Sequence, residues 1–192
     1  MLSRMTVEQF AEALAAATPT PGGGSASAQA GAMAASLIQM MCDLTLGREQ
    51  YRAHEQAVQG IRHRAEGLRK DLLALVDRDA QAYDAVVTAR RLPKTTEAER
   101  EARSAALDRA NLFAIEAPMA IADACTALMG MASDLASRGN VNAVISVRVN
   151  LKGVKDEARG AKIRDRVRRL EMDAEKLREE ALTAIYLRTN GR

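Results

Sequence analysis

Apolar residues recur along this chain at intervals of three and four, the spacing of one face of an α-helix. The pattern predicts helices over 50–90, from 97 toward 139 and over 156–189, each with an apolar seam on which another helix can pack. The first seam consists of Val58, Ile61, Ala65, Leu68, Leu72 and Leu75. The second consists of Leu107, Ala110, Ala114, Ala117, Ile121, Ala124, Leu128, Met131 and Leu135.

Short sequence motifs predict where two of the helices begin and where one is interrupted. Thr6-x-x-Gln9 and Thr96-x-x-Glu99 have the spacing of a capping box, in which two side chains and two backbone amides pair at a helix start. They predict a short helix over 7–16 and the start of the long helix at 97. Pro118 predicts a kink or break within that long helix.

A further helix is predicted over 25–46, after a Pro- and Gly-rich turn over 18–24 and before Gly47. Its apolar stripe consists of Ala30, Met33, Ala34, Leu37, Met41 and Leu44. Its other faces carry Ala, Ser and Gln, and a helix that is small or apolar all round favours the centre of a bundle. The strand-like stretch 140–152 is too short to form a sheet by itself.

The composition agrees with a helical protein. Of the 192 residues 47% are hydrophobic but only 3% are aromatic, and Ala, Leu and Met, which dominate with Val, are good helix formers. The length indicates one domain over 1–192. We therefore predict an all-α fold, a bundle of long antiparallel helices whose core is completed by homodimerisation.

Charge, cysteine and histidine patterns argue against several classes of protein. The formal net charge is +3, and the Arg-rich run 159–169 is interleaved with acids and lacks aromatic residues, so no nucleic-acid partner is expected. Cys42 and Cys125 lack Cys-x-x-Cys spacing and are expected to be reduced core residues. His54 and His63 do not share a helical face as zinc ligands would. No metal is expected, with a carboxylate-bound magnesium as the open alternative.

No membrane segment is predicted. The amino terminus lacks the apolar core of a signal peptide. The uncharged stretch 13–42 contains prolines, glycines and polar residues, unlike a membrane span. A cytoplasmic location is the default expectation.

The turn Pro21-Gly22-Gly23-Gly24-Ser25 is the first candidate site. A helix start offers free N–H groups and the positive end of the helix dipole, and glycines let a ligand approach the backbone closely. The turn lacks the Lys-Ser/Thr of a Walker loop, and no strand precedes it as in a dinucleotide site. The alternative is a flexible turn with Ser25 as an N-cap.

The second candidate site follows from the seam over 50–90. Four residues beyond Leu75 the seam reaches Asp79, and four further on it reaches Tyr83. A carboxylate thus stands where the pattern requires an apolar residue, and buried carboxylates are typical of proton-transfer sites. The alternative is a buried partner for an arginine or for a helix end. Asp77 and Asp84 fall off the seam and are expected to be solvated.

Several short motifs follow one another along nearly the whole chain. They are Thr18-Pro-Thr-Pro-Gly-Gly-Gly-Ser25, Gly31-Ala-Met-Ala-Ala, Leu44-Thr-Leu-Gly-Arg48, Asp77-x-Asp79-x-x-x-Tyr83, Leu92-Pro-Lys94-Thr, Ala117-Pro118, Gly139-Asn140, and Val149-Asn150-Leu151 before Asp156-Glu157. In this order they resemble the cyclodeaminase/cyclohydrolase family, which includes the carboxy-terminal domain of formiminotransferase-cyclodeaminase and stand-alone methenyltetrahydrofolate cyclohydrolases.

The resemblance implies an all-helical, homodimeric folate enzyme without metal, and with no cofactor beyond its tetrahydrofolate substrate. One family reaction closes 5-formiminotetrahydrofolate to 5,10-methenyltetrahydrofolate with loss of ammonia. The other adds water to the methenyl bridge and gives 10-formyltetrahydrofolate. No formiminotransferase domain precedes the chain, which favours the cyclohydrolase.

The resemblance also implies roles for the candidate residues. Asp79 would be the catalytic carboxylate and Tyr83 its orienting partner. The turn over 21–25 would receive the pterin or aminobenzoyl part of the substrate, with Asn140 as a further substrate-binding residue. Lys94, which by itself would read as a solvated loop lysine, would bind the carboxylates of the glutamate tail.

The sequence departs from the family in one place. Family members carry a further helix between the Gly-Asn and Asn-Leu motifs, whereas here 142–148 connects the two directly. About five helical turns, with an acidic residue and one wall of the site, are therefore left out, either by deletion or because a disordered stretch is missing from this numbering. The alternatives are a folate-binding or structural helical dimer without catalysis and, third, a basic nucleic-acid binder.

Overall fold

The computed structural model of the chain describes residues 1–139 together with 157–158, 161–162, 165, 168–169 and 172. All regular secondary structure in these described residues is helical, which confirms the predicted all-α class. The chain divides into two compact units, Met1–Val141 and Asn142–Arg192. All of the candidate site residues except Asn140 lie in the described part of the first unit. The last predicted helix and the strand-like stretch lie largely outside the described residues.

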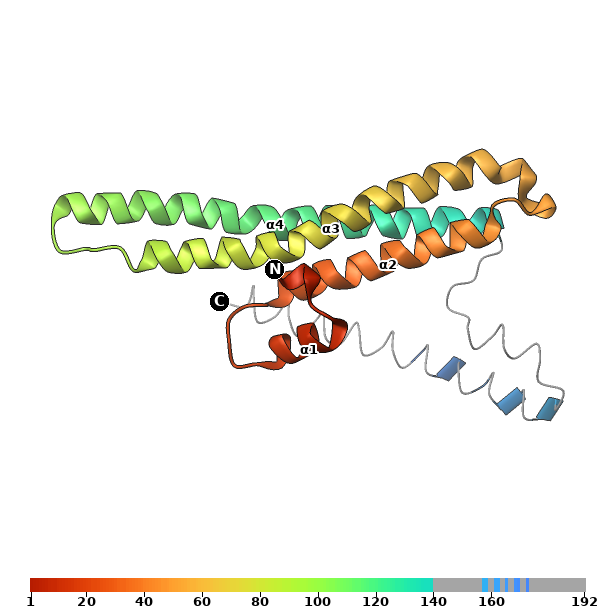
Figure 1. The fold of residues 1–192 in the computed structure, drawn as a ribbon, viewed down its shortest axis with the longest axis horizontal. Helices are drawn as coiled ribbons and strands as arrows, with labels where there is room; N and C mark the ends of the chain where they lie inside the picture. Colours follow the sequence, from red (N-terminus) through yellow and green to blue (C-terminus); the bar gives the residue numbers. More distant parts are fainter. Residues whose placement is uncertain (140–156, 159–160, 163–164, 166–167, 170–171, 173–192) are drawn as a thin grey trace. The chain divides into compact units, whose positions relative to one another are not determined.

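The first unit is built around three long helices. In chain order its elements are η1 (Leu2–Arg4), α1 (Val7–Ala15), α2 (Gly23–Thr45), η2 (Glu49–His54), α3 (Glu55–Arg90) and α4 (Glu97–Gly139). Figure 1 shows α2, α3 and α4 packed side by side, each antiparallel to the one before it. α2 covers only part of α3, whose second half continues as a hairpin with α4.

Both predicted capping boxes are confirmed. The amide of Gln9 donates to Thr6 Oγ1 at 3.1 Å, and the amide of Thr6 donates to Gln9 Oε1 at 3.0 Å. At the start of α4, Glu99 N donates to Thr96 Oγ1 at 3.2 Å and Thr96 N donates to Glu99 Oε2 at 2.9 Å. Hydrogen bonds from the amides of Thr96 and Thr95 hold the pKa of Glu99 below its ordinary value.

The predicted seams of α3 and α4 form most of the core. On α3 the seam is buried except for Leu68, which is half-buried. On α4 the buried seam residues are Ala110, Ala117, Ile121, Ala124, Leu128 and Met131. α4 continues through Pro118 without the predicted break. Beyond the start of α2, which contacts α3 at Val76 and Asp79, the hairpin of α3 and α4 has a small separate cluster around Val86, Ala89 and Ala110.

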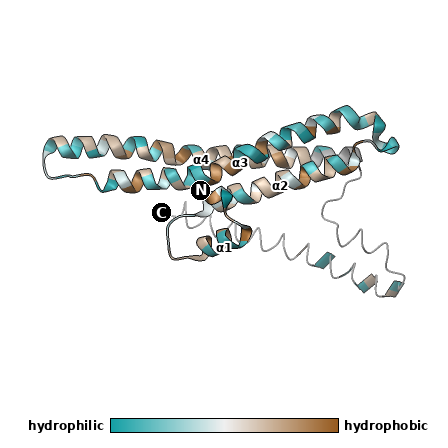
Figure 2. Ribbon diagram, in the orientation of Figure 1, coloured by the Kyte–Doolittle hydropathy of each residue, from teal (hydrophilic) through white to brown (hydrophobic). Residues whose placement is uncertain are grey.

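α2 buries a different face from the predicted stripe. Its buried residues are Ser25, Ala28, Gly31, Ala32, Ala35, Ile38, Cys42 and Thr45. Four apolar residues of the opposite face, here called the outer stripe, are 43–57% exposed: Met33, Leu37, Met40 and Leu44. Both faces of α2 are apolar or small, so the spacing could not choose between them (Figure 2).

Close helix approach explains why the small face of α2 is buried. A Cβ atom on Gly31 would lie 3.1 Å from Cys125 Sγ and 3.2 Å from Leu72 Cδ1, so α2 is held tightly against both α3 and α4 at this point. Cys42 and Cys125 are free thiols, as predicted. Burial raises the pKa of the Cys42 thiol, and the charge of Asp43 raises it further.

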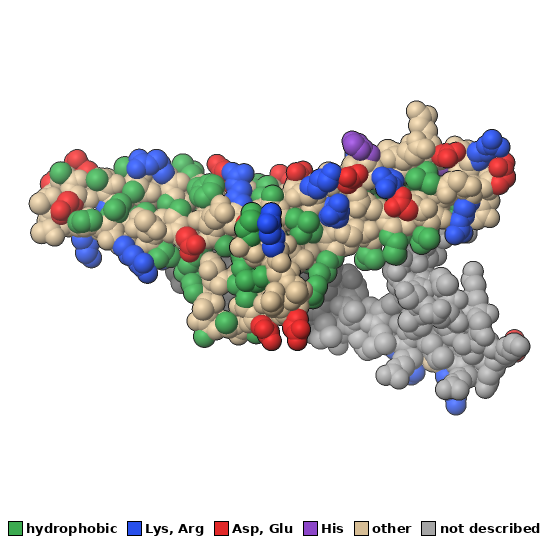
Figure 3. All heavy atoms as spheres, viewed as in Figure 1, with side chains coloured by type: hydrophobic (Ala, Val, Ile, Leu, Met, Phe, Trp, Pro, Cys, Tyr) green, Lys and Arg blue, Asp and Glu red, His purple; other side chains and the backbone are tan. Residues whose placement is uncertain are grey.

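α4 also exposes apolar residues on the side away from the core. They are Leu112, Ile115, Met119 and Met129. By length and composition alone Glu97–Ala132 could cross a membrane: an 18-residue window within it has a mean hydropathy of 1.5, and 22% of that window is buried. Its buried seam nevertheless packs on α2 and α3 along the bundle. Figure 3 shows charged side chains distributed along the length of the long helices, and hydrophobic side chains at the surface along the lower edge of α2.

Candidate functional site

Asp79 of α3 contacts the first turn of α2. Its Oδ2 atom accepts a hydrogen bond from the backbone N–H of Ser25 at 2.8 Å, and lies 2.9 Å from the Ser25 hydroxyl. Asp79 is half-buried, whereas Ser25 is fully buried and also directs its hydroxyl toward the carbonyl oxygen of Val76 at 2.9 Å. The structure thus brings together the two candidate sites that the sequence placed 54 residues apart.

The turn over 21–25, here called the glycine turn, has the form that the contact with Asp79 requires. The N-cap residue of α2 is Gly22, which has no side chain to accept the free amides of the first turn, and the carboxylate of Asp79 takes that place. A Cβ atom on Gly24 would overlap the carboxylate of Asp79, whereas one on Gly23 would meet nothing within 4 Å. Gly24 is therefore the glycine of this turn that leaves room for Asp79. Pro21, which is buried, enters the turn through a cis peptide bond.

Tyr83 and Lys94 lie apart from this contact. Tyr83 is 39% exposed and has no hydrogen-bond partner among the described residues. The buried positions of α3 continue through Ala82 and Val86, a step of three after Asp79 instead of the predicted step of four to Tyr83. Lys94 is exposed in the connector between α3 and α4. Asn140 lies outside the described residues.

The expectation that Asp77 is solvated is wrong, whereas Asp84 is exposed as expected. Asp77 is 9% exposed and accepts hydrogen bonds from the start of the chain. Its Oδ1 accepts from the amides of Leu2 at 2.5 Å and Ser3 at 3.5 Å, and its Oδ2 accepts from the Ser3 hydroxyl at 2.5 Å. Because these partners lie more than 70 residues away in the sequence, helical spacing gives no signal of them.

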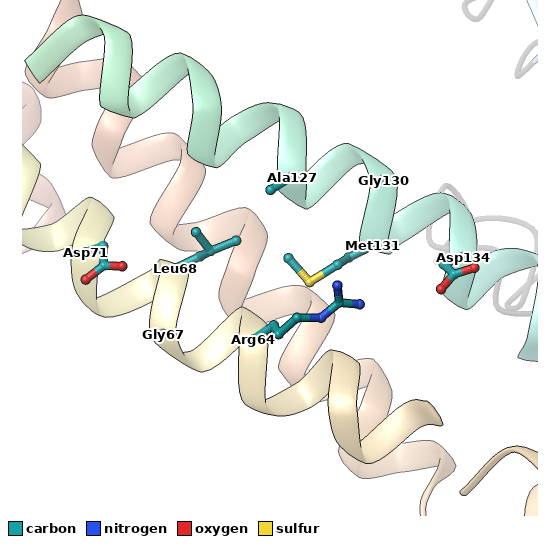
Figure 4. A pocket seen from close by; sticks show the side chains of 8 residues that line it. All are labelled: Arg64, Gly67, Leu68, Asp71, Ala127, Gly130, Met131 and Asp134. Atoms are coloured by element: carbon teal, nitrogen blue, oxygen red, sulfur yellow. The ribbon is translucent and has the colours of Figure 1, made fainter. Parts of the chain in front are cut away.

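Two neighbouring hollows run between α3 and α4, and they lie apart from Asp79. One has a volume of about 530 Å³. Figure 4 shows Asp71 of α3 and Asp134 of α4 at its opposite ends, with Leu68, Met131 and Arg64 between them. The second, of the same volume, shares Leu68 and Asp71 with the first. Neither is lined by Asp79 or by the glycine turn. Among the described residues no three acidic, histidine or cysteine side chains are grouped to hold a metal ion.

The contact between Asp79 and α2 defines what this site can do chemically. A carboxylate at a helix N-terminus is stabilised by the positive end of the helix dipole. The carboxylate of Asp79 therefore occupies the anion-binding position at the start of α2. This carboxylate is a fixed negative charge and can accept a proton. Fold and site together describe an all-α protein with a half-buried carboxylate fixed at the start of a helix.

Comparison with known proteins places the chain in a family. Residues 6–146 match formiminotransferase-cyclodeaminase, and the chain belongs to this family. It is 33% identical to the methenyltetrahydrofolate cyclohydrolase of Methylorubrum extorquens over 176 residues, an alignment that covers 82% of this chain and 85% of that protein. It is 30% identical to the formimidoyltransferase-cyclodeaminase of Sus scrofa over 74% of this chain, and spans 30% of that longer protein.

A solved structure has the same fold. The crystal structure of formiminotetrahydrofolate cyclodeaminase from Thermotoga maritima matches with a TM-score of 0.64 and 25% sequence identity, covering 92% of this chain and 93% of that one.

The alignment with the Methylorubrum protein also shows a difference in length. Since 82% of 192 residues is about 157, about 19 of the 176 aligned residues have no counterpart in this chain. About 19 residues correspond to about five helical turns, the length of the family helix that 142–148 is expected to lack.

Proposed function

We propose that this chain is a folate one-carbon enzyme, and specifically a methenyltetrahydrofolate cyclohydrolase. The observation that carries the proposal is the carboxylate of Asp79, fixed at the first turn of α2 beside the glycine turn. The substrate of this reaction is a cation, and a fixed negative charge stabilises a cation. The Methylorubrum relative, whose printed activity is this one, aligns over most of its length.

The reaction needs one group that takes and returns a proton. As the oxygen of water bonds to the methenyl carbon, Asp79 takes a proton from that water. The bond from this carbon to N5 then breaks, N5 takes the proton from Asp79, and the new hydroxyl loses its proton to solvent. The formyl group remains on N10, and one proton is released overall. The proposed reaction requires only the folate substrate and water.

The remaining candidate residues would hold the rest of the substrate. Of the predicted turn over 21–25, residues 21–24 would contact the pterin or aminobenzoyl part, because Ser25 is fully buried. Tyr83, one helical turn beyond Asp79, would orient the carboxylate or the ring. Lys94 would bind the carboxylates of the glutamate tail. From Asp79 to the end of α3 the helix rises about 16 Å, so Lys94 would meet the far end of an extended ligand. Asn140 remains a further candidate for substrate binding.

The test follows the ultraviolet absorbance of 5,10-methenyltetrahydrofolate with the purified full chain. We expect decay well above the buffer rate and 10-formyltetrahydrofolate as product. The second candidate is the cyclodeaminase reaction, favoured by the Thermotoga structure; formation of methenyltetrahydrofolate and ammonia from 5-formiminotetrahydrofolate would establish it instead. Binding of folate without turnover of either substrate would identify a non-catalytic member of the family.

We propose further that the functional form is a homodimer that packs through the outer stripe of α2. The four exposed side chains of the outer stripe are apolar, and residues 13–42 contain no charged side chain. Contiguous exposed apolar patches of this kind are typical of interaction sites. A two-fold pairing of the same stripe from two copies would cover both stripes at once.

The dimer predicts different results for two matched substitutions. Leu37→Arg, on the outer stripe, is expected to give a monomer in light scattering or sedimentation, because it places two charges in the paired surface. Leu112→Arg, at a somewhat more exposed apolar position of α4 (66% against 56% for Leu37), is expected to leave the dimer intact. A monomeric wild-type chain would refute the dimer. If Leu112→Arg dissociated the dimer and Leu37→Arg did not, the interface would lie on α4 instead of α2.

A further inference from the structure

We infer that Ser25 is a positioning residue for Asp79, and that Oδ1 of Asp79 is the oxygen presented to the substrate. The inference rests on the proposed function, because it assigns the two oxygens of the proposed catalytic carboxylate to different tasks. In it, Ser25 does not contact the folate.

Oδ2 is the oxygen that the protein holds. Both the amide and the hydroxyl of Ser25 lie within 2.9 Å of it. The hydroxyl has one proton and lies 2.9 Å from both Oδ2 and the Val76 carbonyl oxygen, so it can donate to either. Because Ser25 is fully buried, its side chain is held by packing and is not available to a ligand in solvent.

Oδ1 is the oxygen that remains free. No hydrogen bond to it is present among the described residues. Every buried side-chain nitrogen or oxygen in the described part of the chain has a hydrogen-bond partner, and Asp79 is half-buried. Oδ1 therefore reaches the surface, where water or a substrate can occupy its unused lone pairs.

Gly24 keeps open the space in which this carboxylate lies. Of the three carboxyl atoms, Oδ1 is the nearest to the position that a Cβ on Gly24 would take, and all three would be overlapped. Any side chain at this position would push the carboxylate away from Ser25. Gly24 and Ser25 thus fix one orientation of Asp79 from two sides.

The experiment separates this role from that of a simple helix cap. Ser25→Ala keeps the amide bond to Oδ2 and removes the hydroxyl. Since a displacement of about 1 Å at a reacting group can cost about 100-fold in rate, we expect kcat to fall about 10- to 100-fold with KM changed less than about 2-fold. Ser25→Thr, which keeps the hydroxyl, is expected to recover most of kcat. Gly24→Ala is expected to lower kcat at least as much as Ser25→Ala.

Thermal unfolding of each variant accompanies the kinetics, and Ser36→Ala is the matched control. Ser36 lies exposed on the same helix and donates to the Ala32 carbonyl oxygen, so its loss should leave kcat unchanged. If folded Ser25→Ala were fully active, the inference would be overturned. Turnover by the wild-type chain would still support the proposed function. If Ser25→Ala does not fold, full activity of Gly24→Ala would overturn it. Absence of wild-type turnover would refute the proposed function itself, and the inference with it.

Discussion

Asp79→Asn is expected to lower kcat for methenyltetrahydrofolate hydrolysis by at least about 100-fold while the chain remains folded. General acid–base groups contribute about 100- to 10,000-fold to rate, and asparagine can neither take the proton of the attacking water nor offer a negative charge to the cation. The amide oxygen can still accept the hydrogen bond from the Ser25 amide, so the first turn of α2 keeps a cap. Decay of the substrate absorbance measures the effect.

A matched control makes this result specific. Asp84 lies on the same helix with an exposed side chain, and Asp84→Asn removes the same charge without touching α2. We expect it to retain wild-type kcat. Circular dichroism should show the same helicity for both variants and for wild type. Undiminished hydrolysis by Asp79→Asn would remove the carboxylate from the mechanism, even if the chain is an active cyclohydrolase.

Gly31→Val is expected to lower the free energy of unfolding by about 2–3 kcal/mol, because overpacking a tight core costs about 1–3 kcal/mol or more. The first added carbon alone would lie 3.1–3.3 Å from Cys125 Sγ and the two Leu72 methyl groups. Valine adds two further carbons at the point where α2 meets both other helices. Urea unfolding followed by circular dichroism measures the change.

The same substitution at a different glycine serves as the control. A Cβ on Gly60, in the exposed part of α3, would meet nothing within 4 Å. Since valine and glycine differ by only about 0.4 kcal/mol in helix propensity, Gly60→Val should leave the unfolding free energy within about 0.5 kcal/mol of wild type. Equal stability of the Gly31 and Gly60 variants would show that α2 is not packed as tightly as the structure shows.

The sequence predicted those features that depend on local spacing. Capping boxes at Thr6 and Thr96 and the seams of α3 and α4 are set by residues three or four apart, and the structure confirms them. The same spacing led from Leu75 to Asp79. It failed one step later at Tyr83, because a helix of 3.6 residues per turn needs steps of three as well as four.

Features that depend on distant partners could not be predicted in this way. Asp77 is buried because the chain returns its first residues to α3. The buried face of α2 is chosen by how closely the backbone at Gly31 can approach Leu72. Both depend on which segments meet in three dimensions, and neither leaves a periodic signal in the chain.

The hydrogen-bonded contact between Asp79 and Ser25 has a practical use. Ser25 lies on α2 and Asp79 on α3, and the connector between these helices carries no residue of the site. A chain cut between Gly47 and His54 would therefore give two fragments, each with one of the two residues. Enzymatic signal would then arise only when the pieces reassociate. The chain thereby offers a starting point for a split reporter whose output records complementation of its fragments.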